Sequence, residues 1–268
     1  MAHAASSIGA LVRSWREQRH LSQLDLAMEA EISQKHLSFI ESGRAAPSRE
    51  MVITLAEHLD VPLRERNALL LAAGFAPVYR DRPLDDPALV QARAAIDQLL
   101  KAHEPYPALT VDRHWTLVAA NGAVTPLIAG VDPDLVKPPV NVMRLSLHPR
   151  GLAPLIVNLG EWRNHLIERL RRQHRITRDR TIEALLKEVS AYPGVPQRKP
   201  ETASQQDAVV VPLRLRTHGG MLSFLSTITV FGTAVDISLS ELSLEAFYPA
   251  DEATATALGR TSVRDHTT

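Results

Sequence analysis

The residues best suited to recognise another molecule lie in one short stretch, ISQKHLSFIESGR, which spans residues 32–44. With the period of an α-helix, one face of this stretch carries Ser33, Leu37 and Ile40, of which Leu37 and Ile40 would anchor the helix against the core. The opposite face is polar, with an aromatic ring on its flank: Gln34, Lys35, Ser38 and Phe39. In the DNA major groove an amide pairs with adenine, an ammonium reaches guanine acceptors and an apolar ring suits a thymine methyl. The stretch therefore indicates a helix that reads base edges.

Two residues of this stretch have alternative explanations. Phe39 lies close enough to the edge of the predicted core to pack partly inward. His36 lies near the buried side, so packing or helix capping would explain it as well as a base contact would. Arg44 lies just beyond the expected helix end, where it suits a phosphate contact. Gln23 begins the preceding helix, where an amide can also touch a phosphate.

The common catalytic and metal-binding patterns are missing from the sequence. It contains no G-x-S-x-G, no H-E-x-x-H and no glycine loop that would cradle a phosphate. Glu161 and His165 lie one helical turn apart and could share a metal, but no third ligand accompanies them. With zero cysteines, the chain has no thiol nucleophile, disulfide or thiolate metal site. We therefore expect a protein that is not an enzyme and that uses no cofactor or metal.

Five short helices are expected in the first 75 residues, and they would position this stretch. Serines are placed as N-caps before several of them: Ser6 or Ser7, Ser22 and Ser48. Gly43 follows the third helix at the position where a left-handed residue ends a helix. The second helix, SQLDLAMEA, would bury one apolar stripe: Leu24, Leu26, Ala27 and Ala30. Helix, short turn, helix is the arrangement whose second helix enters the major groove.

The remaining chain predicts a second, α+β domain. The segment APVYRDRPLDDP is rich in proline and charge, which marks a linker. A helix is expected over residues 88–103, and two extended runs flank a tight turn at Arg113–His114. Helical patterns dominate residues 151–191, before a second hairpin centred on residues 218–220 and one more strand over 242–249. The antiparallel sheet is thus split between the start and the end of this domain.

Composition limits the possible partners. The 268 residues suit two domains, the apolar fraction of 45% supports packed cores, and no window approaches a membrane span. The first residues show no secretory signal, so we expect a cytoplasmic protein. Residues 1–80 hold nine Lys/Arg and nine Asp/Glu, which implies few phosphate contacts and modest DNA affinity for one copy. A homodimer on two half-sites about one DNA turn apart is therefore expected.

Residues 8–74, and above all SQLDLAMEAEISQKHLSFIESGRAAPS, resemble the Xre/Cro/C1-type helix-turn-helix family. By this similarity the base-contacting positions are Gln34, Lys35 and Phe39, with neighbours Ser33, His36 and Ser38 and backbone contacts from Gln23 and Arg44. Glu31 departs from the family, which usually has glycine at this position of the turn. A positive φ is expected there, and a non-glycine residue with such a φ costs roughly 1 kcal/mol.

The second domain resembles the MmyB-like ligand-binding domain, through LDDPALVQARAAIDQLLKAHEPYPALTVDRHW, NVMRLSLHPRGL and LSLEAFYPADEAT. The resemblance implies bacterial transcription regulation, a PAS-like sheet and an apolar pocket for a fatty acid or similar small molecule. Candidate pocket residues are Asn121, Asn141, Arg144, His148, Trp162 and Phe224. Local explanations stay open for most of them: Asn121 as a helix cap, Trp162 as core, and Arg144 and His148 as partners of nearby carbonyls.

The sequence thus predicts an α+β protein with a helix-turn-helix domain at 1–75, a linker at 76–87, a PAS-like domain at 88–255 and a disordered tail at 256–268. The expected partners are double-stranded operator DNA, a fatty-acid-like molecule and a second copy of the chain, with no membrane. An alternative is that the second domain only dimerises or binds another protein, for instance through the basic segment Arg169–Arg180. An enzymatic second domain is disfavoured by the missing motifs.

Overall fold

The computed structural model describes residues 7–193, 210–231 and 236–264. They belong to two compact units. The N-terminal unit comprises Met1–Pro83 together with Gly232–Ser240, and the C-terminal unit comprises Leu84–Phe231 together with Glu241–Thr268. A short segment from the last third of the chain is therefore part of the N-terminal unit, and the predicted linker, residues 76–87, is divided between the two units.

The described residues up to position 75 contain the five predicted helices: α1 (Ile8–Gln18), α2 (Gln23–Glu29), α3 (Gln34–Glu41), α4 (Arg49–His58) and α5 (Leu63–Ala72). Four of them begin at a serine whose hydroxyl accepts a backbone N–H of the first turn: Ser7, Ser22, Ser33 and Ser48. Gly43 and Gly74 follow α3 and α5 with φ of 75° and 84°, which is the left-handed helix ending expected of glycine.

The core of this unit is made by the apolar stripes of its helices, with fully buried side chains such as Leu26, Leu37, Ile40, Leu55 and Leu69. The prediction that Leu24 is buried is wrong, because its side chain is 50% exposed. Position 24 lies two residues before Leu26, which turns it to the opposite side of the helix.

Two backbone features hold α3 in its position. Helices α1 and α3 approach so closely that a Cβ atom on Gly9 would lie 2.3 Å from the carbonyl oxygen of Ile40, so only glycine fits. The turn between α2 and α3 passes through Glu31 with a φ of 54°. The predicted positive φ at this non-glycine residue is thus confirmed.

The end of the N-terminal unit is fixed to α5 by polar contacts. Asn67 accepts the backbone N–H of Val78 and of Tyr79, and its amide donates to the Tyr79 carbonyl. Helix α11 (Ile237–Ser240) packs against α5, and the backbone N–H of Ile237 donates to the Arg80 carbonyl at 2.8 Å. Contacts between residues far apart in the sequence therefore hold this unit together.

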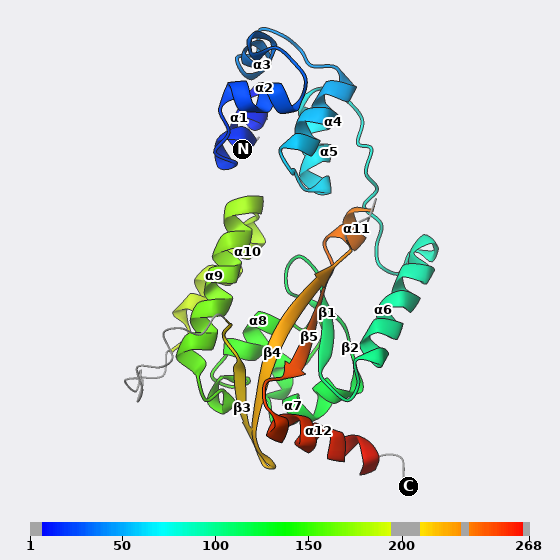
Figure 1. The fold of residues 1–268 in the computed structure, drawn as a ribbon, viewed down its shortest axis with the longest axis vertical. Helices are drawn as coiled ribbons and strands as arrows, with labels where there is room; N and C mark the ends of the chain where they lie inside the picture. Colours follow the sequence, from blue (N-terminus) through cyan, green and yellow to red (C-terminus); the bar gives the residue numbers. More distant parts are fainter. Residues whose placement is uncertain (1–6, 194–209, 232–235, 265–268) are drawn as a thin grey trace. The chain divides into compact units, whose positions relative to one another are not determined.

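The C-terminal unit is built on a five-stranded antiparallel sheet (Figure 1). Its strands are β1 (Ala108–Val111), β2 (Leu117–Ala120), β3 (Leu213–Thr217), β4 (Gly220–Val230) and β5 (Ser243–Pro249), in the order β2-β1-β5-β4-β3. Both predicted hairpins and the predicted last strand are present. The first and last parts of the domain meet where β1 pairs with β5.

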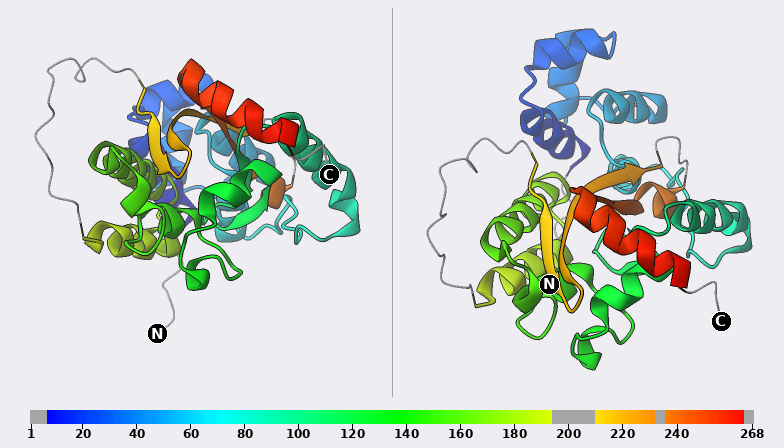
Figure 2. Two further views of the ribbon diagram at one scale, coloured as in Figure 1. Left: turned by 90° about the horizontal axis from the view of Figure 1, so that it is seen from below. Right: turned by 60° about the horizontal axis from the view of Figure 1, so that its bottom comes forward.

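Helices surround this sheet: η1 (Pro87–Leu89), α6 (Val90–Ala102), η2 (Gly122–Val124), α7 (Thr125–Ile128), η3 (Pro133–Leu135), α8 (Val142–Leu147), η4 (Ala153–Leu155), α9 (Leu159–Thr177), α10 (Arg180–Ala191) and α12 (Glu252–Arg264). Helix α6 packs against β1, α9 packs against α10, and α12 (red in Figure 2) packs against β4 and β5. No helix among the described residues is long and apolar enough to cross a membrane.

Helix α12 corrects the predicted disorder of residues 256–268. Residues 256–264 are helical, whereas 265–268 lie outside the described residues. Asp251 accepts the backbone N–H of Thr254 at 2.7 Å, and the Thr254 hydroxyl, itself buried, accepts the Ser223 N–H of β4 at 2.9 Å. Ala257 and Leu258 then pack against the core of the unit. Tertiary packing thus orders a segment whose composition alone looked like a tail.

Candidate DNA interface and ligand pocket

Helix α3 is anchored by its inner face and capped at its start. Leu37 and Ile40 are fully buried against the other helices of the unit. Ser33 is the N-cap, and its hydroxyl accepts the backbone N–H of His36 at 3.1 Å. These contacts fix the rotation of α3 about its axis, and with it the direction of the opposite face.

The opposite face of α3 is open and cationic. Gln34 and Lys35 are exposed, and Phe39 is partly exposed. The Phe39 ring lies between two cations, with Lys35 Nζ at 5.7 Å and Arg44 Cζ at 5.9 Å from its centroid. The ring is therefore not sealed inside the core, and the cations beside it face the same solvent as the ring edge.

The other side chains predicted to contact DNA are half-buried or already hydrogen-bonded within the protein. Ser33 is exposed but its hydroxyl already caps α3, while His36 and Ser38 are half-buried. Gln23 is half-buried, and its amide donates to Glu41 Oε2 at 2.8 Å. Its second N–H is the group left for a phosphate.

A buried ion pair, which the sequence did not reveal, joins three helices behind this face. Arg16 of α1 pairs with Glu41 of α3 through Nε–Oε1 at 2.7 Å and Nη2–Oε2 at 3.0 Å. The side chains of Arg16 and Glu41 are only 10% and 3% exposed. Because Gln23 of α2 binds the same carboxylate, Glu41 fixes α1, α2 and α3 to one another.

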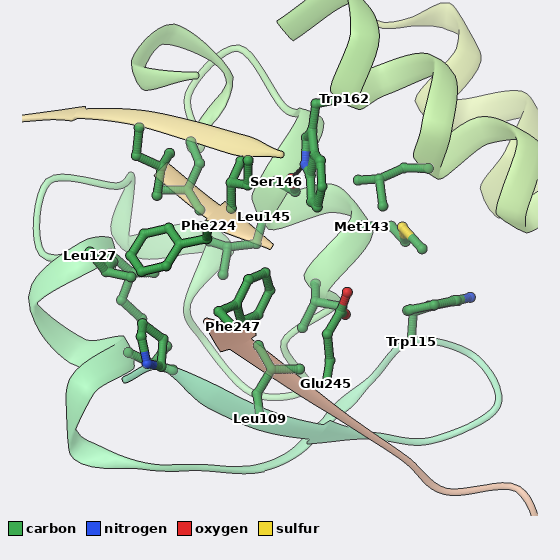
Figure 3. Close-up of a pocket in the computed structure, with 18 residues that line it drawn as sticks. Leu109, Trp115, Leu127, Met143, Leu145, Ser146, Trp162, Phe224, Glu245 and Phe247 are labelled. Carbon is green, nitrogen blue, oxygen red and sulfur yellow. Dashed lines mark hydrogen bonds between the residues drawn. The ribbon is translucent and has the colours of Figure 1, made fainter. Parts of the chain in front are cut away.

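The C-terminal unit encloses an apolar pocket between its sheet and helices α7, α8 and α9 (Figure 3). Its volume, part of which is open to solvent, is about 700 Å³. Mostly apolar side chains line it: Pro107, Leu109, Trp115, Val124, Leu127, Ile128, Val142, Met143, Leu145, Ser146, Leu152, Trp162, Leu166, Leu213, Leu215, Phe224, Glu245 and Phe247. A lining of this kind suits a small apolar ligand.

Two of the six predicted pocket residues, Trp162 and Phe224, line this cavity. Trp162 stands on α9, and its Nε1 donates to the Ser146 hydroxyl at 3.0 Å, which fixes the indole plane. Phe224 of β4 meets Phe247 of β5 edge to face, with ring centroids 6.2 Å apart. Together these rings form the aromatic part of the wall.

The two predicted asparagines lie outside the pocket lining. Asn121 is buried, accepts the Ala108 N–H at 3.1 Å and donates to the carbonyls of Leu100 and Tyr106. It makes no side-chain cap to the helix that follows it, so that interpretation is also wrong. Asn141 caps α8 through the Arg144 N–H at 3.2 Å and donates to the His114 carbonyl at 2.8 Å. Both amides are used to hold the backbone.

The two predicted cations also lie outside the lining. Arg144 makes a two-pronged ion pair with Glu188 of α10, at 2.8 Å for both Nε–Oε1 and Nη2–Oε2. His148 meets the Tyr192 ring edge to face at 5.0 Å, and its Nδ1 accepts the Arg150 N–H. The prediction that these groups bind a carboxylate in the pocket is therefore corrected, because each already has a partner elsewhere.

The polar pocket residue that the sequence analysis missed is Glu245. In β5 the period of two puts Glu245 on the same face as Phe247, and both point into the cavity in Figure 3. Its neighbour across the β1–β5 ladder is Leu109, which also lines the pocket. The sequence signal that could have identified this pocket residue is that Glu245 is a single carboxylate in a strand of mostly apolar residues.

The weak metal pattern on α9 is not completed by the fold. Among the described residues no three His, Asp or Glu side chains come together as a metal site. Asn158 donates to Glu161, and the His165 ring stacks on Trp162 at 5.5 Å between centroids. Burial lowers the pKa of His165, and the nearby Arg169 charge lowers it further.

Comparisons with known proteins give two family matches. Residues 92–260 match the MmyB-like transcription regulator ligand binding domain, and residues 12–66 match a helix-turn-helix family. A comparison with curated proteins found no match. Solved structures with matches include "Structure of an RNA-binding Light-Oxygen-Voltage Receptor", at 13% identity and a TM-score of 0.26. That match covers 98% of this chain but 64% of the other, less than two thirds of its length, and its score is too low to indicate a shared fold.

Proposed function

Because the chain belongs to the MmyB-like transcription regulators, we propose that it binds palindromic operator DNA as a homodimer and senses a fatty-acid-like molecule in its C-terminal pocket. The family makes it a DNA-binding transcription regulator with a ligand-binding domain. The observation that carries the more detailed proposal is the open face of α3, on which Lys35 and Arg44 flank the Phe39 ring.

On the DNA side, α3 lies in the major groove and its exposed residues meet the bases. Gln34 pairs with adenine, Lys35 reaches guanine acceptors, and Phe39 covers a thymine methyl between the two cations. Arg44 and Gln23 contact phosphates, and the remaining predicted neighbours border the contact: Ser33, His36 and Ser38.

Dimeric binding follows from the charge of the N-terminal unit. Residues 1–80 hold nine Lys/Arg and nine Asp/Glu, so one copy gains little from the general attraction of the phosphates. A dimer on two half-sites doubles the contact area while each α3 keeps its own few bases. The half-sites would then lie about 10 base pairs apart, centre to centre.

On the ligand side, the pocket supports binding of a small apolar molecule. Its walls are almost entirely aliphatic or aromatic, and its two polar groups are Ser146 and Glu245. An elongated, fatty-acid-like molecule would bury its chain against Leu109, Met143 and Phe224.

A path from the pocket to the DNA reader exists along the chain itself. Strand β5 carries Glu245 and Phe247 in the pocket wall and begins at Ser243, three residues after α11 ends. Helix α11 belongs to the N-terminal unit, where the Asp236 carboxylate pairs with Arg82 at 3.0 Å just before the helix begins. Ligand binding that shifts β5 would therefore also displace α11, which packs against α5. This displacement would change the arrangement of the helix-turn-helix that binds DNA.

The alternative, a second domain that only associates with protein, has one observation in its favour. Ile228 and Val230 of β4 are 48% and 59% exposed although both are apolar. Exposed apolar side chains of this kind can form part of a protein contact. The two functions are separated by whether a small molecule changes DNA binding.

Selection of bound sequences from random duplex DNA, with the full chain, tests the proposal. It should enrich a palindrome, and Lys35→Ala should abolish the enrichment. Lys137→Ala is the matched control, because Lys137 is an exposed lysine of the C-terminal unit. Failure to enrich any sequence, or the same enriched sequence with Lys35→Ala, would contradict the proposed reader.

A further inference from the structure

The pocket has one charged group in its wall, and that group is an acid. Of the 18 described residues that line the cavity, Glu245 alone is ionisable, and its side chain is 7% exposed. In Figure 3 its carboxylate points into the space bordered by Met143, Phe247 and Trp115. A fatty acid would therefore bring its own carboxylate into a pocket that already contains a negative charge.

Arg169 donates a hydrogen bond to only one of the two oxygens of this carboxylate. Its Nη1 donates to Glu245 Oε1 at 3.1 Å, and its guanidinium lies 4.2 Å from the centroid of the Trp115 ring. No described residue donates a hydrogen bond to the second oxygen, Glu245 Oε2. The carboxylate thus keeps one acceptor for a ligand, while the face of the guanidinium is covered by the indole.

The other cations around the pocket offer no second site for an acid. Arg144 is held by Glu188 through two hydrogen bonds, and neither residue lines the cavity. His165 is packed on Trp162, and burial together with the Arg169 charge lowers its pKa. Arg169 does not line the cavity, whereas Glu245 does, and the side chains of this pair are 16% and 7% exposed, so a ligand carboxylate in the pocket would meet Glu245 first.

We infer that the effector is a neutral amphipathic molecule whose polar end, a hydroxyl or an amide N–H, donates a hydrogen bond to Glu245. This inference rests on the proposed sensor function and specifies its ligand class. A neutral donor satisfies the free oxygen of Glu245 without adding charge to the Arg169–Glu245 pair. A carboxylate of the same chain length would lie next to a like charge in an apolar pocket and would lack a donor.

Titration of the full chain with 1-decanol and with decanoate, which share a chain length, tests this inference. Quenching of Trp115 and Trp162, which both line the pocket, would report binding. Decanol should bind at least about tenfold more tightly than decanoate at neutral pH. Equal affinity, or tighter binding of decanoate, would overturn the assignment of the ligand class.

Variants separate this inference from the sensor proposal. Glu245→Gln should remove the preference for decanol, because Arg169 is then free to receive a carboxylate, whereas Glu188→Gln should leave the preference intact. The double variant Arg169→Met with Glu245→Gln leaves no charge at this wall. It should keep a preference for decanol, because an unpaired carboxylate is costly in an apolar pocket, but a smaller one than the wild-type chain shows, because the like charge of Glu245 is gone. If neither compound binds the wild-type chain, the sensor proposal fails as well. If both bind it equally, only the ligand class is wrong.

Discussion

The buried ion pair behind α3 gives a sharp test of how the DNA reader is held together. Glu41→Ala removes the two hydrogen bonds from Arg16 and the one from Gln23. Among the described residues, Arg16 then keeps the Leu21 carbonyl as a hydrogen-bond acceptor, at 2.8 Å from Nη1, while its side chain stays about nine-tenths buried. An unpaired cation in such a place is costly, and removal of one partner of a buried pair costs about 3–5 kcal/mol.

A matched control lies on α1, the helix that carries Arg16. Glu17 accepts a hydrogen bond from Arg13 at 2.7 Å, with the same pair of residue types. These side chains are 53% and 63% exposed, however, so water replaces the partner when Glu17→Ala removes it. Glu17→Ala should therefore leave the stability of the N-terminal unit almost unchanged.

Native-state hydrogen exchange, read by mass spectrometry on the full chain, measures this difference. In Glu41→Ala the slowest amides of α1 and α3 should exchange roughly 100-fold faster or more, since each 1.4 kcal/mol corresponds to about a factor of ten. Exchange in the C-terminal unit serves as the internal reference. Equal exchange rates in α1 and α3 for Glu41→Ala and Glu17→Ala would refute the idea that the pair is structurally required.

Three further outcomes are expected. Gly9→Ala should destabilise the N-terminal unit by about 1–3 kcal/mol, measured by urea unfolding, because the new Cβ would lie 2.3 Å from a backbone oxygen of α3. Gly130→Ala should leave the stability of the chain unchanged, because no atom lies within 4 Å of the new Cβ. Asn121→Ala should lower the stability of the C-terminal unit by at least about 1–3 kcal/mol in thermal unfolding, because three buried backbone groups lose their partner. Since burial lowers the folded-state pKa of His165, the unfolded chain gains a proton first as the pH falls. Urea midpoints of the C-terminal unit should thus drop as pH falls below about 6.5, and less so in His165→Gln.

Local signals made the N-terminal unit predictable. Ser22 and Ser48 cap helices that begin one residue later, and Gly43 and Gly74 end two of the helices. Each signal acts within one helical turn, so neighbouring residues in the sequence suffice to identify it. For the second domain the sequence predicted only that the antiparallel sheet is split between the start and the end of the domain, and the pairing of β1 with β5 is known from the structure.

The polar part of the pocket was not predictable because its partners are distant. Arg144 pairs with a glutamate 44 residues away, and Glu245 pairs with an arginine 76 residues away. Spacing in the sequence says nothing about such pairs. Trp162 and Phe224 line the cavity, because large apolar side chains on amphipathic elements face the interior whatever their partners are.

The assignment of residues 232–240 to the N-terminal unit lies equally far beyond sequence reasoning. The ion pair between Arg82 and Asp236 spans 154 residues. The predicted hairpin at residues 218–220 and the predicted strand at 242–249 gave no reason to expect that residues between them belong to the other unit. Only the fold shows that helix α11 belongs to the N-terminal unit.

The most direct test of the regulator account is the affinity of the full chain for its selected operator, measured by fluorescence anisotropy. Loss of base contacts costs about 1–3 kcal/mol for each good pair, so Gln34→Ala with Lys35→Ala should bind at least about tenfold more weakly. The circular dichroism spectrum should not change, because both side chains are exposed. Wild-type affinity in this double variant would contradict the claim that the open face of α3 reads DNA.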